Sequence, residues 1–88
     1  MKFLAICSPK GEAPDDRFAE LVPEEAEALR RLKARSILVE AWSPGGPGAV
    51  LILEAASEGE AEAIMAQLPL AAAGFIEATL TPLHDLAL

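Results

Sequence analysis

The sequence predicts an α+β protein of the ferredoxin-like βαββαβ order, with a four-stranded antiparallel sheet (order 4-1-3-2) and two helices on one face. The first observation behind this prediction is that short apolar runs alternate with charged segments of helical spacing. The second is that glycine and proline mark the boundaries between them, most clearly at Pro69 and Gly74. The sequence contains no repeat, linker or low-complexity stretch, so residues 1–88 are expected to form one domain.

The first half of the chain predicts a strand and a long helix. Residues 3–7 are an apolar run closed by a Ser-Pro-Lys-Gly turn, which is typical of a strand. A polar loop follows, in which Asp15 and Asp16 can cap the next helix. That helix is predicted over residues 17–35, with acidic residues early and basic residues late, as the helix dipole favours. Because proline lacks an N–H donor, we expect a kink or a restart of the helix at Pro23.

A β-hairpin and a second helix are predicted next. Apolar runs at residues 37–42 and 49–56 flank a Gly/Pro loop, and this pattern indicates a hairpin. Ser57 and Glu60 have the spacing of a capping box, in which each side chain bonds the other residue's backbone. The helix that they begin is expected to run to about residue 68 and to bury Ala61, Ile64, Met65 and Leu68.

Proline and glycine then separate this helix from the last strand. Pro69 is expected to end the helix, because it cannot continue the backbone hydrogen-bond ladder. Gly74 is expected to close the short turn that follows. Residues 75–83 are predicted to form the last strand, directly after the turn.

Composition limits the possible partners. Hydrophobic residues make up 52% of the chain and the mean hydropathy is +0.31, yet a chain of this length buries only about 60–65% of its unfolded surface. The excess apolar surface predicts self-association as a homodimer or a larger ring. A net charge of -7 argues against nucleic acid and anionic membranes, and no apolar run approaches the roughly 18 residues of a membrane span.

Residue usage suggests a compartment. The single cysteine, Cys7, cannot form an internal disulfide, and a cytoplasmic protein is expected. Cys7 itself is expected to be a small buried hydrophobe, with a reactive thiol as the alternative. The absence of Asn and the single Gln fit a thermophile or a GC-rich genome.

The predicted strands do not alternate between apolar and polar residues, which indicates that both faces of the sheet are buried. Two short helices can cover only one face. Sorted by parity, one set is purely apolar and is expected to face the helices: Leu4, Ile6, Ile37, Val39, Ala41, Leu51, Leu53, Ile76, Ala78 and Leu80. The other set holds the aromatic and acidic residues and is expected to face a second copy: Phe3, Ala5, Cys7, Leu38, Glu40, Trp42, Val50, Ile52, Glu54, Phe75, Glu77 and Thr79.

This second set predicts a ligand cavity between the two sheets of a homodimer. Glu40 and Glu54 are the predicted catalytic residues, because burial raises a carboxyl pKa and suits the group to proton transfer near neutral pH. The predicted ligand-binding residues are Trp42, Phe75, Glu77 and Phe3. In the alternative interpretation, the carboxylates lie at the rim of the sheet and meet water or arginine, and Trp42 packs in the subunit interface.

His84 is a further candidate, because the ordinary pKa of histidine lies near neutrality and the tail could fold over the cavity mouth. A solvated tail is the alternative. One histidine and one cysteine would need carboxylates to complete a zinc site, so we predict no metal and no cofactor. The loop at residues 45–48 lacks the Lys-Ser/Thr ending of a phosphate-binding loop.

Three segments carry a family resemblance: the acidic helix at residues 23–32 (PEEAEALRRL), the hairpin turn Gly45-Gly46, and residues 67–70 (QLPL) before the last strand. Together they resemble the muconolactone isomerase-like group of the dimeric α+β barrel superfamily. The next residues, 71–74 (AAAG), are similar to the YCII-related proteins of the same superfamily. The similarity covers nearly the whole chain.

The resemblance implies a protomer that pairs through its sheet, often within a larger ring, and a small hydrophobic or lactone-like ligand. It also implies a role for Glu25, which matches an acidic position of the family. Otherwise, a glutamate in the first turn of a helix is a partner of the helix dipole. The isomerases have a lysine where this chain has Ala26, and the YCII-related proteins have a helix-one histidine that this chain lacks.

Two functions follow from these observations. The first is a homo-oligomeric barrel that binds a small apolar or lactone-like molecule and transforms it by proton transfer, as in the isomerases. The second is a non-catalytic oligomeric binding module in which the carboxylates are structural.

Overall fold

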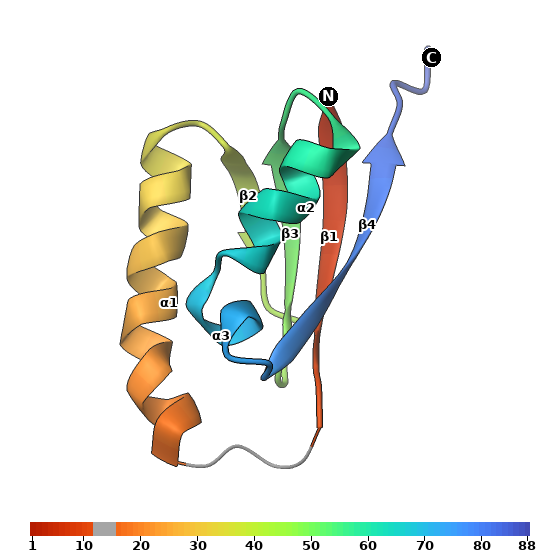
Figure 1. The fold of residues 1–88 in the computed structure, drawn as a ribbon. Coiled ribbons are helices and arrows are strands. Elements are labelled where there is room, and N and C mark those ends of the chain that lie inside the picture. The colour runs from red at the N-terminus through yellow and green to blue at the C-terminus, as the bar shows by residue number, and fades with distance from the viewer. Residues whose placement is uncertain (12–15) are drawn as a thin grey trace.

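The computed structural model describes residues 1–11 and 16–88, and it shows a four-stranded antiparallel sheet with helices packed on one face (Figure 1). The strands are β1 (Lys2–Pro9), β2 (Leu38–Trp42), β3 (Ala49–Glu54) and β4 (Ile76–Leu83). Their order across the sheet is β2-β3-β1-β4, which from the other edge is 4-1-3-2. The predicted fold class and strand order are therefore confirmed.

The first helix, α1 (Asp16–Ala34), runs through Pro23 without a break, so the predicted restart is wrong. Pro23 is exposed, and the carbonyl that loses its N–H partner there can bind water. Asp16 is the first residue of α1, whereas Asp15 lies outside the described residues. Val22 is 46% exposed. No residue of α1 is fully buried; the half-buried side chains that pack against the core include Ala28, Leu29 and Leu32.

The second helix, α2 (Glu58–Ala66), begins at the predicted capping box. The Glu60 N–H donates to Ser57 Oγ at 3.1 Å. The Glu60 carboxylate accepts from the N–H of Ala56 at 3.3 Å, one residue earlier than expected. None of the helices in the described part of the chain is both long and apolar enough to cross a membrane.

A short helix, α3 (Pro69–Ala72), occupies the segment that was predicted as a turn. Proline stands at its start, where the missing N–H costs nothing. Gly74 ends the segment with a φ of +83°, in the left-handed region that glycine adopts without strain. α3 therefore sets the position at which the chain enters β4.

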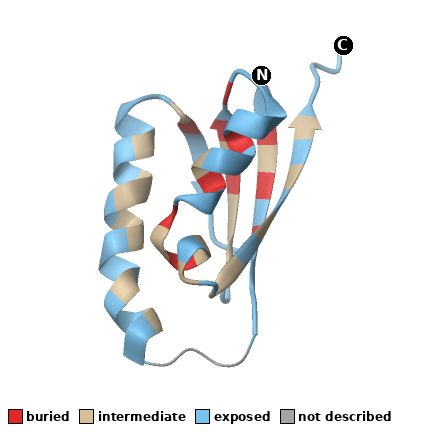
Figure 2. Cartoon of the chain, viewed as in Figure 1, coloured by how far each residue is buried: buried red, intermediate tan, exposed pale blue. Residues whose placement is uncertain are grey.

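The orientation of β1 is opposite to the predicted one. Phe3, Ala5 and Cys7 are buried in the core beneath the helices, which Figure 2 shows on the near side of the sheet. Leu4 and Ile6 therefore lie on the other, open face. The prediction was wrong because both faces of β1 are apolar, and a strand without alternation does not indicate which face is covered.

A bulge changes the parity of β2. The register shifts between Leu38 and Glu40, so that two residues of β2 lie opposite one of β3. Leu38 is buried opposite Leu53, whereas Val39 is 45% exposed, and the predicted sides of these two residues are wrong. Beyond the bulge, Glu40 and Trp42 lie on the open face, in agreement with their predicted parity.

Candidate functional site

The open face of the sheet has an apolar centre with polar ends. Aligned partners across the strands form two rows: Glu40, Ile52, Leu4 and Thr81 in one, and Trp42, Val50, Ile6 and Thr79 in the next. Ile6 is 44% exposed and Trp42 is 63% exposed. The structure therefore brings Glu40 and Trp42 together on the edge strand β2, but a single chain does not enclose them.

Glu54 lies at the end of β3 and has a partner. Its Oε1 accepts from the N-terminal ammonium of Met1 at 3.2 Å, and both groups are about half exposed. A pair this exposed contributes at most about 1 kcal/mol. The acid/base role predicted for Glu40 and Glu54 depends on a second copy that covers this face, and it stays a prediction.

Two of the predicted ligand-binding residues are not on the open face. Phe3 is fully buried beneath the helices. Phe75 precedes β4, and its ring packs edge-on against Phe18 of α1 with ring centroids 5.5 Å apart. The predicted placement of Phe75 is wrong because the strand begins only at Ile76, so the alternation of β4 does not yet apply to it.

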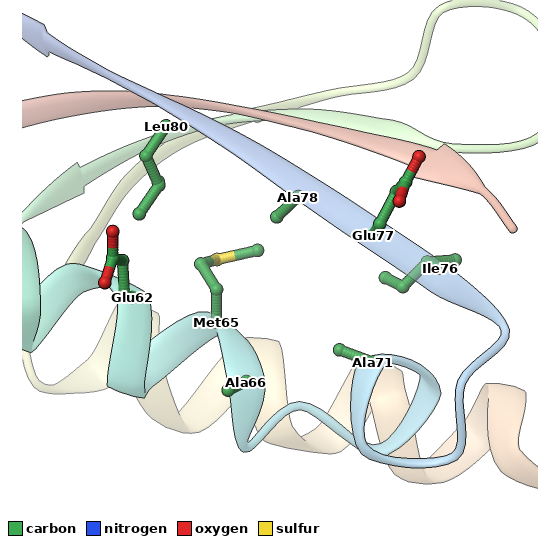
Figure 3. Close-up of a pocket in the computed structure, with 8 residues that line it drawn as sticks. All are labelled: Glu62, Met65, Ala66, Ala71, Ile76, Glu77, Ala78 and Leu80. Atoms are coloured by element: carbon green, nitrogen blue, oxygen red, sulfur yellow. The ribbon is translucent and has the colours of Figure 1, made fainter.

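Glu77 and His84 lie at opposite ends of β4. Glu77 is exposed, and Figure 3 shows its carboxylate pointing away from a hollow of about 320 Å³ between α2, α3 and β4. Met65 reaches into that hollow from α2, with Ala71 beside it. His84 is exposed beyond the other end of the strand. The hollow is thus an apolar surface feature, and Glu77, predicted to bind a ligand, does not point into it.

A second cavity, of about 300 Å³, contains a carboxylate among apolar walls and is the candidate site. We call it the Glu25 pocket. From α1 it is lined by Phe18, Glu25 and Leu29. The other elements contribute Cys7, Leu70, Ile76, Ala49, Leu51 and the loop residues Gly46, Pro47 and Gly48.

The Glu25 carboxylate is held by α3. The N–H of Leu70 donates to Glu25 Oε1 at 3.1 Å, in a partly buried contact between residues 45 positions apart. Leu70 is in the first turn of α3, where backbone N–H groups have no partner within the helix. Among the described residues, the structure gives the other carboxylate oxygen no hydrogen-bond partner, and that oxygen can act on a ligand.

Burial perturbs both titratable groups of the Glu25 pocket. Loss of solvent raises the pKa of the Glu25 carboxyl, and the hydrogen bond from Leu70 partly opposes this effect. Burial, followed by the charge of Glu25, raises the pKa of the Cys7 thiol to about 11. Cys7 is therefore a neutral thiol at pH 7, and Glu25 is the group suited to proton transfer.

From the sequence, Glu25 was only a minor candidate, and its alternative interpretation was that of a dipole partner in the first turn of a helix. Because α1 begins at Asp16, Glu25 lies in the middle of the helix, and that interpretation is wrong. The sequence feature that indicates the burial of Glu25 is its spacing from apolar residues of the same helix. Leu21, Glu25 and Leu29 are four residues apart, so the carboxylate falls within an apolar stripe. An acid at such a position is buried against whatever the helix covers.

Comparisons with known proteins agree with this architecture. The family model described as muconolactone delta-isomerase matches residues 1–86. A crystal structure of muconolactone isomerase aligns with a TM-score of 0.84 at 18% identity, over 99% of this chain and 92% of that one. A comparison with curated proteins gave no match.

A further similar structure is 5-chloro-2-hydroxyhydroquinone dehydrochlorinase from Burkholderia phenoliruptrix AC1100, in complex with 2,5-dihydroxybenzoquinone. It aligns with a TM-score of 0.71 at 20% identity, over 96% of this chain and 94% of that one. At these identities the two structures show a shared fold.

Proposed function

The chain belongs to the muconolactone delta-isomerase family, and from this membership we propose that it is an enzyme that moves a proton on a small lactone-like ring in the Glu25 pocket. The predicted resemblance to the isomerase-like group is thereby confirmed. The observation that carries the proposal is the half-buried Glu25 carboxylate, fixed by the Leu70 N–H in a cavity of about 300 Å³ with apolar walls. A cavity of this size is at the lower end of the range for small-molecule sites.

In the proposed reaction, Glu25 acts first as a base and then as an acid. The ionised carboxylate removes a proton from a ring carbon next to a C=C–C=O system, and a dienolate forms. The protonated carboxyl then delivers the proton to a different carbon, so a double bond shifts and no atom is gained or lost. The Leu70 N–H keeps the carboxylate oriented toward the ligand cavity.

The ligand bound in the similar dehydrochlorinase structure supports the proposed size and class of ligand. That enzyme was solved with 2,5-dihydroxybenzoquinone, a single six-membered ring with conjugated carbonyl groups. A ring of this size suits a cavity of about 300 Å³. Conjugated carbonyl groups also acidify neighbouring C–H bonds, and a carboxylate base needs such acidity in its substrate.

The test is isomerisation of simple butenolides in D₂O, followed by proton NMR. The wild-type protein is expected to interconvert the α,β- and β,γ-unsaturated isomers and to exchange their acidic C–H. Glu25→Gln is expected to lower kcat/KM by about 10²–10⁴-fold, because it removes the general base and keeps an oxygen for the Leu70 N–H. Glu24→Gln, at an exposed neighbouring position, removes the same charge and should change the rate less than about twofold. Full activity of folded Glu25→Gln would overturn the proposal.

We also propose that the open faces of two copies pack together. Leu4, Ile6, Val50 and Ile52 provide the apolar centre of this interface. In such a dimer Glu40 and Glu54 would flank the contact and Trp42 would be covered. The site roles predicted for these three residues require this dimer, because a single chain leaves them on an open face. The location that we propose is the cytoplasm, because the chain's single cysteine leaves no internal disulfide to form.

A further inference from the structure

Two contacts join α1 to residues 69–75, which form α3 and lead into β4. One is the hydrogen bond from the Leu70 N–H to Glu25 Oε1, 3.1 Å long. The other is the contact of the Phe18 and Phe75 rings, whose centroids are 5.5 Å apart at an interplanar angle of 89°. Aromatic rings attract each other in this edge-to-face arrangement. Figure 1 shows α3 between α1 and the start of β4, where these contacts lie.

The two contacts lie on the same side of α1, on either side of its proline. Phe18 and Glu25 are seven residues apart, which is nearly two turns and about 10 Å along the helix axis. Pro23 stands between them, and α1 has one backbone hydrogen bond fewer there. The Leu70 N–H therefore holds the part of α1 that follows Pro23, and the ring contact holds the part that precedes it.

Phe75 is also bonded to the residue that holds Glu25. Its N–H donates to the carbonyl oxygen of Leu70 at 2.9 Å. Its own carbonyl oxygen accepts from the N–H of Lys10, directly after β1, at 2.8 Å. A shift of Phe75 is thus transmitted to Leu70 through one main-chain hydrogen bond. Among the described residues, Phe18 belongs to the lining of the Glu25 pocket and Phe75 does not.

We propose that Phe18 and Phe75 are positioning residues of the Glu25 pocket, because their ring contact holds α3 against α1 and keeps the Leu70 N–H on the Glu25 carboxylate. This inference rests on the proposed function of the same pocket. An edge-to-face pair shifts an equilibrium between closed and open arrangements by roughly two- to tenfold. That range is large enough to change how often the carboxylate is correctly placed.

Phe75→Leu tests the proposal, because it removes the ring and keeps an apolar side chain. Exchange of the Leu70 amide, measured by NMR, should become roughly two- to tenfold faster. The Glu25 carboxyl should titrate at higher pH than in wild type, because the bond from Leu70 lowers its pKa. Cys7, the other titratable group in the lining, has its pKa raised to about 11 and stays neutral throughout this titration.

Activity should change in the same direction. The acidic limb of the pH profile of kcat/KM should move to higher pH together with the Glu25 titration. For Phe75→Leu, kcat should fall about three- to tenfold and KM should change less than about twofold, because Phe75 acts from outside the lining. Phe75→Tyr keeps the ring and should restore the wild-type values.

Phe3→Leu is the matched control, because it makes the same chemical change at a fully buried residue outside the lining. It should lower the melting temperature and leave the Glu25 titration as it is in wild type. If Phe3→Leu and Phe75→Leu have equal effects on Leu70 exchange and on the Glu25 titration, the ring contact only adds stability and the inference fails.

A double-mutant cycle shows whether the two rings act together. Phe18→Leu alone should speed Leu70 exchange as Phe75→Leu does, and it provides the same test should Phe75→Leu fail to fold. The double variant should match either single one, since each already removes the contact. Additive effects on Leu70 exchange would contradict the inference.

The exchange and titration measurements need no ligand, so they separate this inference from the proposed function. If both respond as expected while folded Glu25→Gln keeps full activity, the positioning of Glu25 stands and the proton transfer is refuted. If Glu25→Gln loses activity while neither measurement responds to the loss of the ring contact, the proton transfer stands and the positioning role is refuted.

Discussion

At the residue scale, two opposing influences act on Glu25. Burial disfavours its charge, and the Leu70 N–H favours it, with burial the larger effect. The charge is therefore retained at a cost to folding, because the unfolded chain would keep the same carboxylate in water. A group that destabilises the fold in its charged form is more typical of a functional site than of a structural ion pair.

This cost predicts how stability changes with pH. The folded pKa of Glu25 is raised above its ordinary value of 4.5, so the penalty is fully present above the raised pKa and disappears below the ordinary one. Wild-type protein should therefore gain stability relative to Glu25→Gln as the pH falls from 7 to 4. Urea unfolding of both proteins at several pH values measures the difference.

Glu24→Gln serves as the control, because it removes the same net charge from an exposed neighbouring residue. Its difference from wild type should depend less on pH. A difference between Glu25→Gln and wild type that is constant across this range would show that the folded environment does not perturb Glu25.

At the scale of elements, the hairpin loop forms a wall of the Glu25 pocket and presses on β1. Gly48 has a φ of +108°, and a Cβ at this position would collide with the main-chain oxygen of Cys7. Gly46, two residues earlier in the same loop, has neither constraint. The loop therefore requires glycine at position 48, because of its φ and its close contact with β1, whereas position 46 can accept other residues.

Gly48→Ala is consequently expected to destabilise the protein by about 2–4 kcal/mol, through a strained φ and displacement of the loop from β1. Gly46→Ala should lie within about 1 kcal/mol of wild type, because alanine there only reduces the freedom of the unfolded chain. Thermal and urea unfolding measure both. Similar losses in the two variants would mean that the close approach of the loop to β1 does not constrain Gly48.

The order and type of the major elements could be predicted from the sequence because each boundary has its own local signal, such as Pro69 or the Ser57 cap. The covered face was predicted correctly for β3 and β4, where Leu51, Leu53 and Leu80 pack in or against the core. It could not be predicted for β1 and for the start of β2. In β1 both faces are apolar, and in β2 a bulge at Val39 shifts the parity by one residue. Neither effect leaves a local trace, since both are decided by packing against other elements.

The candidate site was only partly predictable for the same reason. Glu25 owes its environment to the Leu70 N–H, which comes from a helix 45 residues later that was predicted as a turn. Glu40 and Glu54, chosen from strand parity, lie on a face that a single chain leaves open. Spacing within α1 was available from the sequence, whereas contacts across the fold were not.

At the scale of the whole molecule, the open face is the main apolar surface that the fold leaves uncovered. Its centre combines Ile6, 44% exposed, with Val50 and the 63% exposed Trp42 on one cross-strand row. Helices cover only the opposite face (Figure 1). Burial of such a surface contributes roughly 25 cal/mol per Å², which favours association of a small chain that is only marginally stable alone.

Trp42 is the chain's only tryptophan, so its fluorescence reports directly on this face. In the associated protein the indole is expected to be shielded, and dilution should shift its emission to longer wavelength as copies separate. Ile6→Lys places a charge at the centre of the contact and should raise the dissociation constant at least about 100-fold. Val22→Lys is the matched control: Val22 is 46% exposed, close to the 44% of Ile6, but lies on α1. If both variants associate as wild type does, the two sheets do not form the interface. The sites predicted at Glu40 and Glu54 would then lose their enclosure, whereas the Glu25 pocket, formed within one chain, would remain.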